Sequence, residues 1–184
     1  MAGVRTPDEL RAAFTPVQTD RLVLRAVRAE DVDAIFAIHG NPETYRFHPD
    51  GVTRSREESA AQLAGWKREW RDVGFGFWAV TVADDPRIVG FGGLTKRTFR
   101  HRPVLNTYYR FDPPAWGHGY ATEMAAAAAA LARSLMPELP MIVRTRPANH
   151  AAQGVAKKLG LVHAADLDDH LLTYVSHCGS GPSG

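Results

Sequence analysis

The chain has one cysteine among its 184 residues, Cys178, close to the C-terminus. A single thiol can form neither an intrachain disulfide nor a cysteine-rich metal site, so we expect a metal-free protein of the reducing cytoplasm. No segment reaches the roughly 18 consecutive apolar residues that a membrane-spanning helix needs. The N-terminus also lacks the basic and then apolar pattern of a signal peptide. These absences predict a cytoplasmic protein without a membrane partner.

The chain also has little excess of charge. It has 22 Lys and Arg residues and 20 Asp and Glu residues, and its formal net charge is +2. No basic stripe runs along a helical face, so no nucleic-acid partner is expected. With 45% hydrophobic residues, the chain can build one sizeable core but is short for two. We predict a loose N-terminal lead-in at 1–16, one domain at 17–178 and a flexible Gly- and Ser-rich tail at 179–184.

The apolar periodicity predicts alternating strands and helices. Ser55 and Glu58 form a capping-box pattern, which starts a helix that ends before Gly74. The residues 95–103 are expected to form a mobile basic connection. The other predicted elements are strands at 21–27, 77–82, 88–94, 104–111, 141–145 and 171–176, and helices at 29–40, 123–135 and 149–159. This order predicts an α/β (α+β) domain around one central sheet.

A glycine-bearing turn between the strand 104–111 and the following helix is the most informative segment. The first turn of a helix has backbone N–H groups without partners and the positive end of the helix dipole, so it can bind an anion. Gly117 and Gly119 leave room for a close approach. The turn lacks the Gly-Lys-Ser/Thr of a P-loop and the three-glycine spacing of a Rossmann fingerprint. By itself this pattern also fits an ordinary strand-to-helix turn.

At this turn the sequence resembles a known family. Trp116-Gly-His-Gly-Tyr-Ala is similar to the Arg/Gln-x-x-Gly-x-Gly/Ala loop of the GNAT superfamily of acyl-CoA N-acyltransferases, with Trp116 in place of Arg or Gln. The RimJ/RimL-like branch often has Trp-Gly-x-Gly-Tyr-Ala-Thr-Glu. The resemblance runs from about Thr19 to Val175, and its other segments are 19–25, 76–80, 88–93 and the helix Asn149-His-Ala-Ala-Gln-Gly-Val-Ala-Lys-Lys-Leu-Gly-Leu161.

The resemblance implies a single GNAT-like domain with a mixed, mostly antiparallel twisted sheet and a splayed parallel strand pair. It implies acetyl-CoA as the acyl donor, with pantetheine entering the splay and the diphosphate on the glycine turn. Asn149 would reach pantetheine, although from the sequence alone it fits a helix N-cap equally well. The cofactor-binding residues so implied are Phe111, Trp116, Gly117, His118, Gly119, Tyr120, Ala121, Thr122 and Asn149.

Two positions depart from the family pattern. RimL-like relatives often have a glutamate five residues before the position of Phe111, as a candidate base, and this chain has Asn106 there. The helix serine of the pattern is replaced by Ala152. An amide cannot accept the amine proton, so at most Asn106 orients a water or the amine. Among the strand phenols Tyr108, Tyr109 and Tyr174 we name Tyr174 as the candidate acid, and three histidines remain alternative bases, namely His48, His101 and His170.

The missing carboxylate points to an acceptor amine of low pKa. A lysine amine, with a pKa of about 10.4, is neutral in only about one molecule in 2,500 at pH 7. A peptide α-amine, with a pKa of about 7.8, is neutral in roughly one molecule in seven or eight. We therefore expect an N-acetyltransferase that acts on a peptide or protein N-terminus or on a small amino-metabolite.

Other interpretations stay open at this point. A CoA-binding sensor or scaffold without turnover would also explain Asn106 and Ala152. The cationic side chains of 95–103 could instead bind an acidic partner or nucleic acid. A homodimer is also compatible with the resemblance. The aromatic side chains at 66–78 fit either core packing or the wall of an acceptor pocket.

Overall fold

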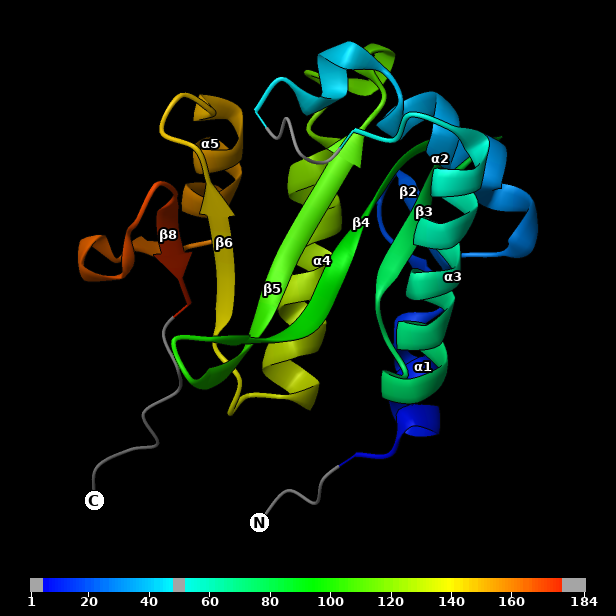
Figure 1. The fold of residues 1–184 in the computed structure, drawn as a ribbon. Coiled ribbons are helices and arrows are strands. Elements are labelled where there is room, and N and C mark those ends of the chain that lie inside the picture. Colours follow the sequence, from blue (N-terminus) through cyan, green and yellow to red (C-terminus); the bar gives the residue numbers. More distant parts are fainter. Residues whose placement is uncertain (1–4, 48–51, 177–184) are drawn as a thin grey trace.

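A computed structural model describes residues 5–47 and 52–176 of the chain. Its strands form one eight-stranded sheet in the order β1-β2-β3-β4-β5-β6-β8-β7, in which the β5–β6 pair is parallel and the other pairs are antiparallel (Figure 1). The strands are β1 (Val17–Gln18), β2 (Leu22–Ala26), β3 (Phe77–Val82), β4 (Asp85–Phe99), β5 (Arg102–Phe111), β6 (Met141–Thr145), β7 (Val162–His163) and β8 (Leu172–Val175). The mixed α/β sheet predicted from the sequence is confirmed.

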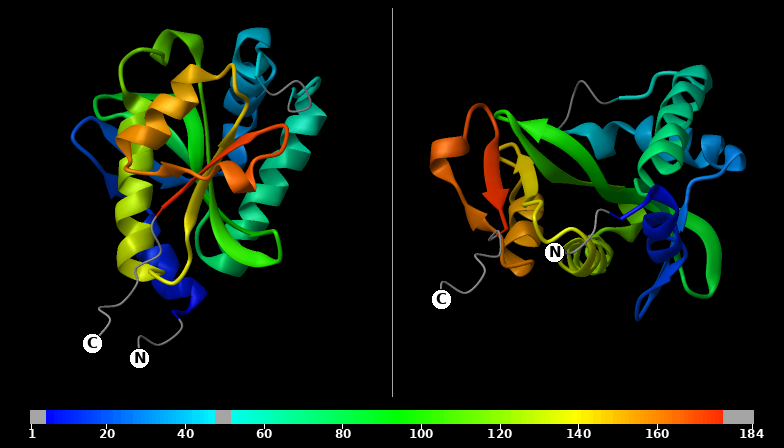
Figure 2. Two further views of the ribbon diagram at one scale, coloured as in Figure 1. Left: turned by 90° about the vertical axis from the view of Figure 1, so that its left-hand side faces the viewer. Right: turned by 90° about the horizontal axis from the view of Figure 1, so that it is seen from below.

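Helices cover both faces of this sheet (Figure 2). The helices α2 and α3 lie on one face, called the front face here, and α4 and α5 lie on the opposite, rear face. The short helix α1 packs against α3 and α4. The helices are α1 (Pro7–Phe14), α2 (Val32–His39), α3 (Arg56–Val73), α4 (Tyr120–Leu135) and α5 (His150–Lys158), and a 3₁₀ turn, η2 (Pro42–Tyr45), follows α2.

Small side chains let α4 lie close to the rear face of the sheet. Ala125, Ala128 and Ala132 are buried along the helix. The sheet has glycines where the helix approaches, since a Cβ placed on Gly92 would lie 2.7 Å from the methyl carbon Cε of Met124. On the front face the aromatic side chains of α3 are core residues, because Trp66 packs on the ring of Phe77 at 5.2 Å.

Two predictions about local structure are wrong. The segment predicted as a loose lead-in contains α1, which has a complete capping box at Thr6 and buries Leu10 and Phe14 in the core. The other residues of this segment are mostly polar and face solvent. The apolar side of the helix is therefore difficult to recognise in the sequence. The segment 95–103 is not a mobile connection but the end of a hairpin, in which β4 and β5 are joined by a turn with positive φ angles at Arg100 and His101.

The parallel strands β5 and β6 pair over a short length. Their register joins Leu105 to Met141 and Asn106 to Ile142, and no pairing follows toward their carboxyl ends. Figure 1 shows the two strands diverging in that direction. Because α4 follows β5 and α5 follows β6, both helix N-termini lie at the open end of this divergence.

Candidate active site

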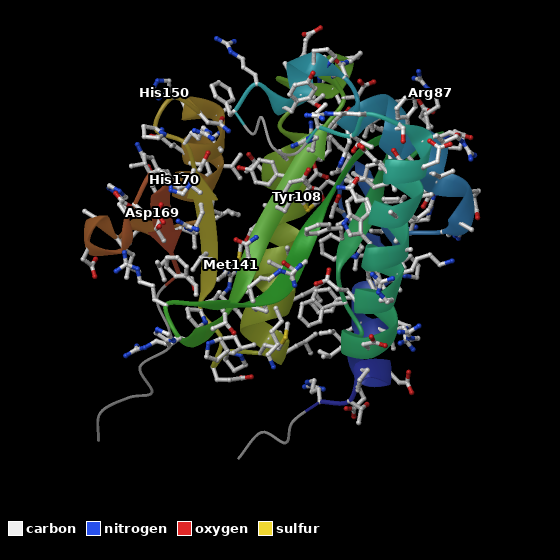
Figure 3. The ribbon with its side chains drawn as sticks, viewed as in Figure 1. Arg87, Tyr108, Met141, His150, Asp169 and His170 are labelled. Atoms are coloured by element: carbon white, nitrogen blue, oxygen red, sulfur yellow. The ribbon has the colours of Figure 1, made fainter. Side chains whose placement is uncertain are left out.

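A cavity of about 220 Å³ lies where β5 and β6 diverge. Its lining comes from both strands, from the N-terminal part of α5, from the η2 segment and from the residues before β8. The lining residues are Thr44, Phe47, Thr107, Tyr108, Tyr109, Arg110, Val143, Arg144, Thr145, Arg146, Asn149, Ala152, His170 and Leu171. Figure 3 labels Tyr108 on β5 and His170 next to the start of β8.

Strand alternation divides this lining between the two faces of the sheet. On the rear face the hydroxyl of Tyr109 donates to the carbonyl oxygen of Ala152 in α5, at 3.4 Å. On the front face Tyr108 packs on Phe77, at 4.8 Å between ring centres. Arg146 also faces front, because its Nε donates to the carbonyl oxygen of Phe47 at 3.0 Å.

The glycine turn before α4 has the geometry of an anion site. Gly117 and Gly119 have φ angles of 79° and 80°, which only glycine adopts without strain. The first helical hydrogen bond runs from the amide of Glu123 to the carbonyl oxygen of Gly119, at 3.1 Å. The amides of the three preceding residues therefore have no acceptor within the helix. The turn is exposed, and a Cβ placed on Gly117 would meet no atom within 4 Å.

An ion pair distant in sequence holds this turn in place. Glu123 accepts hydrogen bonds from Thr19 Oγ1 at 2.6 Å, from the Arg21 amide at 2.8 Å and from Arg21 Nε at 2.7 Å. Arg21 also donates to the carbonyl oxygen of His118 at 2.8 Å. Burial acts to raise the pKa of Glu123, but the hydrogen bonds from Thr19 and Arg21 lower it overall. No local sequence pattern indicates this contact, because about 100 positions separate the partners.

The two other predicted CoA residues are Phe111, at the carboxyl end of β5, and Asn149, before α5. The side chain of Phe111 is buried against Gly90, and its carbonyl oxygen accepts a hydrogen bond from Trp116 Nε1 at 2.8 Å. That carbonyl oxygen is therefore engaged within the protein. Asn149 caps α5, since its Oδ1 accepts from the amide of Ala152 at 3.1 Å. Its side chain also lines the cavity, so the N-cap role and contact with a ligand are compatible.

The two predicted catalytic residues do not line the cavity. Asn106 lies at the last position of β5 that pairs with β6, and the cavity lining begins with the next residue, Thr107. Tyr174 is buried on β8, and its hydroxyl donates to Oε1 of Gln153 at 3.4 Å. Among the alternative bases, His170 lines the cavity, His101 lies in the β4–β5 turn, and His48 lies outside the described residues, as does Cys178.

Burial strongly perturbs three titratable groups beside the cavity. Burial raises the pKa of Tyr109, which stays protonated at neutral pH, and raises the pKa of Tyr108 to about 12. Burial, together with the positive charge of Arg110, lowers the pKa of His39 to about 3. His39 on α2 contacts the ring of Tyr108 at 6.2 Å, and neither of its ring nitrogens has a hydrogen-bond partner in the described chain.

No group of three or more His, Cys, Asp or Glu side chains at 5–47 and 52–176 is arranged to hold a metal ion. Within the same ranges, none of the helices has the length and apolar character needed to span a bilayer.

A family profile described as an acetyltransferase (GNAT) domain matches residues 21–162, which include β5, β6 and the glycine turn. The chain belongs to the GNAT acetyltransferase family. The profile is of the RimJ/RimL type, as the resemblance in the sequence predicted, and the chain is accordingly an acetyltransferase by family. Enzymes of the GNAT family use acetyl-CoA.

Relatives and solved structures agree with this assignment. The uncharacterized N-acetyltransferase YoaA of Bacillus subtilis is 26% identical over 111 residues, which are 60% of this chain and 62% of YoaA. An acetyltransferase from Agrobacterium tumefaciens superposes with a TM-score of 0.75 at 19% sequence identity. The superposition covers 88% of this GNAT chain and 94% of the Agrobacterium chain. RimL, an α-N-protein acetyltransferase of ribosomal L7/L12 solved with CoA, has a TM-score of 0.68 at 17% sequence identity. That superposition covers 86% of this chain and 94% of the RimL chain. At these identities the solved structures show the fold.

Proposed function

We propose that this chain transfers the acetyl group of acetyl-CoA to a primary amine of low pKa. The observation that carries the proposal is the cavity between β5 and β6, together with the exposed turn that follows β5 and begins α4. One end of such a site fits a diphosphate and the other end fits a thioester. The name of the RimL neighbour, an α-N-protein acetyltransferase, supports an N-terminal α-amine as the acceptor.

The turn residues would hold the diphosphate through their backbone. The amides of His118, Gly119, Tyr120, Ala121 and Thr122 precede or open α4, where the helix dipole favours negative charge. Gly117 and Trp116 shape the approach to them. Arg21 adds a cation whose Nη1 is fixed 2.8 Å from the carbonyl oxygen of His118.

The rear half of the cavity would hold pantetheine. Its lining there is neutral, with Tyr109, Thr145 and the side-chain amide of Asn149. We place the backbone pairing at 107–110 of β5, rather than at Phe111, because the Phe111 carbonyl oxygen already accepts from Trp116. Acetyl-CoA supplies the activated acetyl group when it is bound.

Proton transfer sets the requirements for the remaining residues. The amine must be neutral to attack, and Asn106, the residue at the family's carboxylate position, can only orient it. A backbone N–H of β5 would stabilise the oxyanion. We propose Tyr109, rather than Tyr174, as the proton donor to the departing thiolate, because Tyr109 lines the cavity and burial keeps its phenol protonated.

The test is acetyl transfer itself. The protein is incubated with acetyl-CoA and with matched peptides that offer either a free α-amine or an acetylated α-amine and one lysine, and release of CoA thiol is measured. Faster thiol release with the α-amine peptides is the expected result. Faster release with the lysine peptides contradicts the low-pKa acceptor.

A second candidate function is a CoA sensor without turnover, favoured by the amide at Asn106 and the lack of a hydroxyl at Ala152. Thermal stabilisation by CoA without thiol release from any amine would support this sensor and contradict the acetyltransferase. A homodimer and a cytoplasmic location remain predictions, which size-exclusion chromatography with light scattering and cell fractionation would test.

A further inference from the structure

The front half of the cavity carries a concentration of positive charge. Arg110 on β5 and Arg144 and Arg146 on β6 line it. Among the described residues, the cavity lining includes these three arginines and a histidine but no Asp or Glu. Arg110 is the most deeply placed of the three, with only 7% of its surface exposed. A buried guanidinium exerts a stronger field than one in water, because the surrounding medium screens it less.

The three arginines are held in different ways. Arg144 Nη2 donates to Oδ2 of Asp169 at 2.5 Å, so a carboxylate outside the cavity lining compensates its charge. Arg146 Nε is fixed by a neutral group, the carbonyl oxygen of Phe47. Arg110 lies with its guanidinium carbon 5.9 Å from the ring centre of Tyr108. The field of Arg110 reaches its neighbours, since it contributes to the lowered pKa of His39.

The arginine-lined front half of the cavity, called the positive wall here, is unfavourable for a polyamine or a basic peptide and favourable for an anion. We infer that the acceptor amine of this site carries a carboxylate or phosphate group on the same molecule, which Arg146 binds. This inference rests on the proposed acetyl transfer and names the chemical class of its acceptor. The acetyl group passes from sulfur to nitrogen and the amine loses one proton, while the anionic group takes no part in the bond changes.

The positive wall also favours the neutral form of the amine. A nearby cation lowers the pKa of an ammonium group, because it disfavours the charged form. The wall therefore replaces part of what a carboxylate base would do at the position of Asn106.

The test compares acceptors that differ in one charge. Two pairs serve, namely the amidated dipeptides Ala-Asp and Ala-Asn, and glucosamine 6-phosphate and glucosamine. For each pair we expect the anionic member to have a kcat/KM about tenfold higher, the size of one charge-assisted hydrogen bond. A preference confined to the dipeptides identifies a carboxylate, and one confined to the sugars identifies a phosphate.

A variant assigns the preference to Arg146. This residue is half-buried, and Arg146→Gln is expected to bring the ratio within the preferred pair close to one. Arg87→Gln, on an exposed arginine at the far side of the sheet (Figure 3), should leave the ratio unchanged.

Different outcomes contradict the anionic acceptor and the proposed acetyl transfer. Equal kcat/KM values within both pairs, or a higher value for spermidine than for the anionic acceptors, overturn the anionic acceptor and leave acetyl transfer intact. Retention of the full preference in Arg146→Gln also overturns it. Failure to acetylate any amine overturns the proposed function and, with it, the inference.

Discussion

The rear and front halves of the β5–β6 cavity are built from the same two strands but differ in chemistry. The rear half is neutral, with Tyr109 donating to a carbonyl oxygen of α5 and Asn149 capping the same helix. The front half has three arginines, and Tyr108 packs there on the aromatic side chains that α2 and α3 cover. Neighbouring residues of one strand therefore face different surroundings, because successive side chains of a strand point to opposite faces.

This division suggests how one cavity can serve two ligands. A neutral half suits the uncharged pantetheine arm, whose phosphates lie beyond it at the N-terminus of α4. A cationic half suits an anionic acceptor that enters from the opposite face. The reacting groups would meet where the strands diverge, between the two halves. Substitutions in the rear half and in the front half of the cavity should therefore affect different kinetic constants.

The largest effect is expected from Tyr109→Phe, which removes the phenol of the rear half and little else. We expect kcat to fall about 100-fold, the usual size of a lost general acid. Tyr174→Phe is the matched control, because it removes a buried phenol from β8, the strand that pairs with β6. Steady-state kinetics with a saturating acceptor measure both variants.

Equal losses in the two phenylalanine variants would contradict this assignment. If Tyr174→Phe alone lost activity, the acid would be Tyr174, the phenol that the sequence first suggested. An unchanged kcat in both variants would mean that water protonates the thiolate. Only a loss confined to Tyr109→Phe supports the division of the cavity described above.

A smaller effect is expected from His118→Glu, which puts a carboxylate in the exposed turn before α4. We expect the Kd of CoA to rise about 30-fold relative to His118→Gln, through repulsion of the diphosphate at close range. The melting temperature should not fall, because an acidic group near a helix N-terminus is favourable. Isothermal calorimetry and thermal unfolding measure the two quantities.

Ala126→Glu, on an exposed position of α4 beyond its first turn, adds the same charge away from the turn. It should leave the Kd of CoA within about twofold of the unmodified protein, because solvent screens exposed charges at a distance. Equal weakening by both glutamates would mean that net charge, and not the turn, controls affinity. Unchanged affinity in His118→Glu would exclude the turn as the diphosphate site.

Local patterns predicted the parts of this site that are local. The glycine turn was predictable because its function depends on contiguous backbone, in which Gly117 and Gly119 need positive φ angles. The α5 cap at Asn149 was predictable for the same reason. The order of strands and helices followed from periodicity, and the family resemblance supplied the splayed strand pair that periodicity alone does not reveal.

Features that depend on distant pairing were not predictable from one sequence. The clamp of Glu123 by Thr19 and Arg21 joins segments about 100 residues apart. The charge of the front half depends on which residues of β5 and β6 share a face, and a shift of one residue in register would reverse it. Tyr109 and Tyr174 look alike in sequence, and only the fold separates the one that lines the cavity from the one that does not.

The smallest effect concerns His39 on α2, which contacts the ring of Tyr108 in the front half of the cavity. Its pKa is lowered to about 3, so it is neutral in the folded protein, whereas in the unfolded chain it binds a proton below its ordinary pKa of 6.5. Its contribution to stability is therefore present above pH 6.5 and is lost as the pH falls from 6.5 toward 3. Between pH 6.5 and pH 5 this loss should be about 1.5 kcal/mol of unfolding free energy.

Denaturant unfolding of the unmodified protein and of His39→Gln at both pH values measures this loss. The glutamine variant should show a smaller decrease by that amount, whatever its absolute stability, because it cannot take up the proton on unfolding. His150→Gln, at an exposed histidine, should keep the full decrease. A decrease of the same size in His39→Gln would mean that His39 is protonated in the folded protein. The front half would then carry a further positive charge beside Arg110, and its preference for anions would strengthen as the pH falls. A neutral His39, in contrast, leaves the arginines as the source of that preference between pH 5 and 6.5.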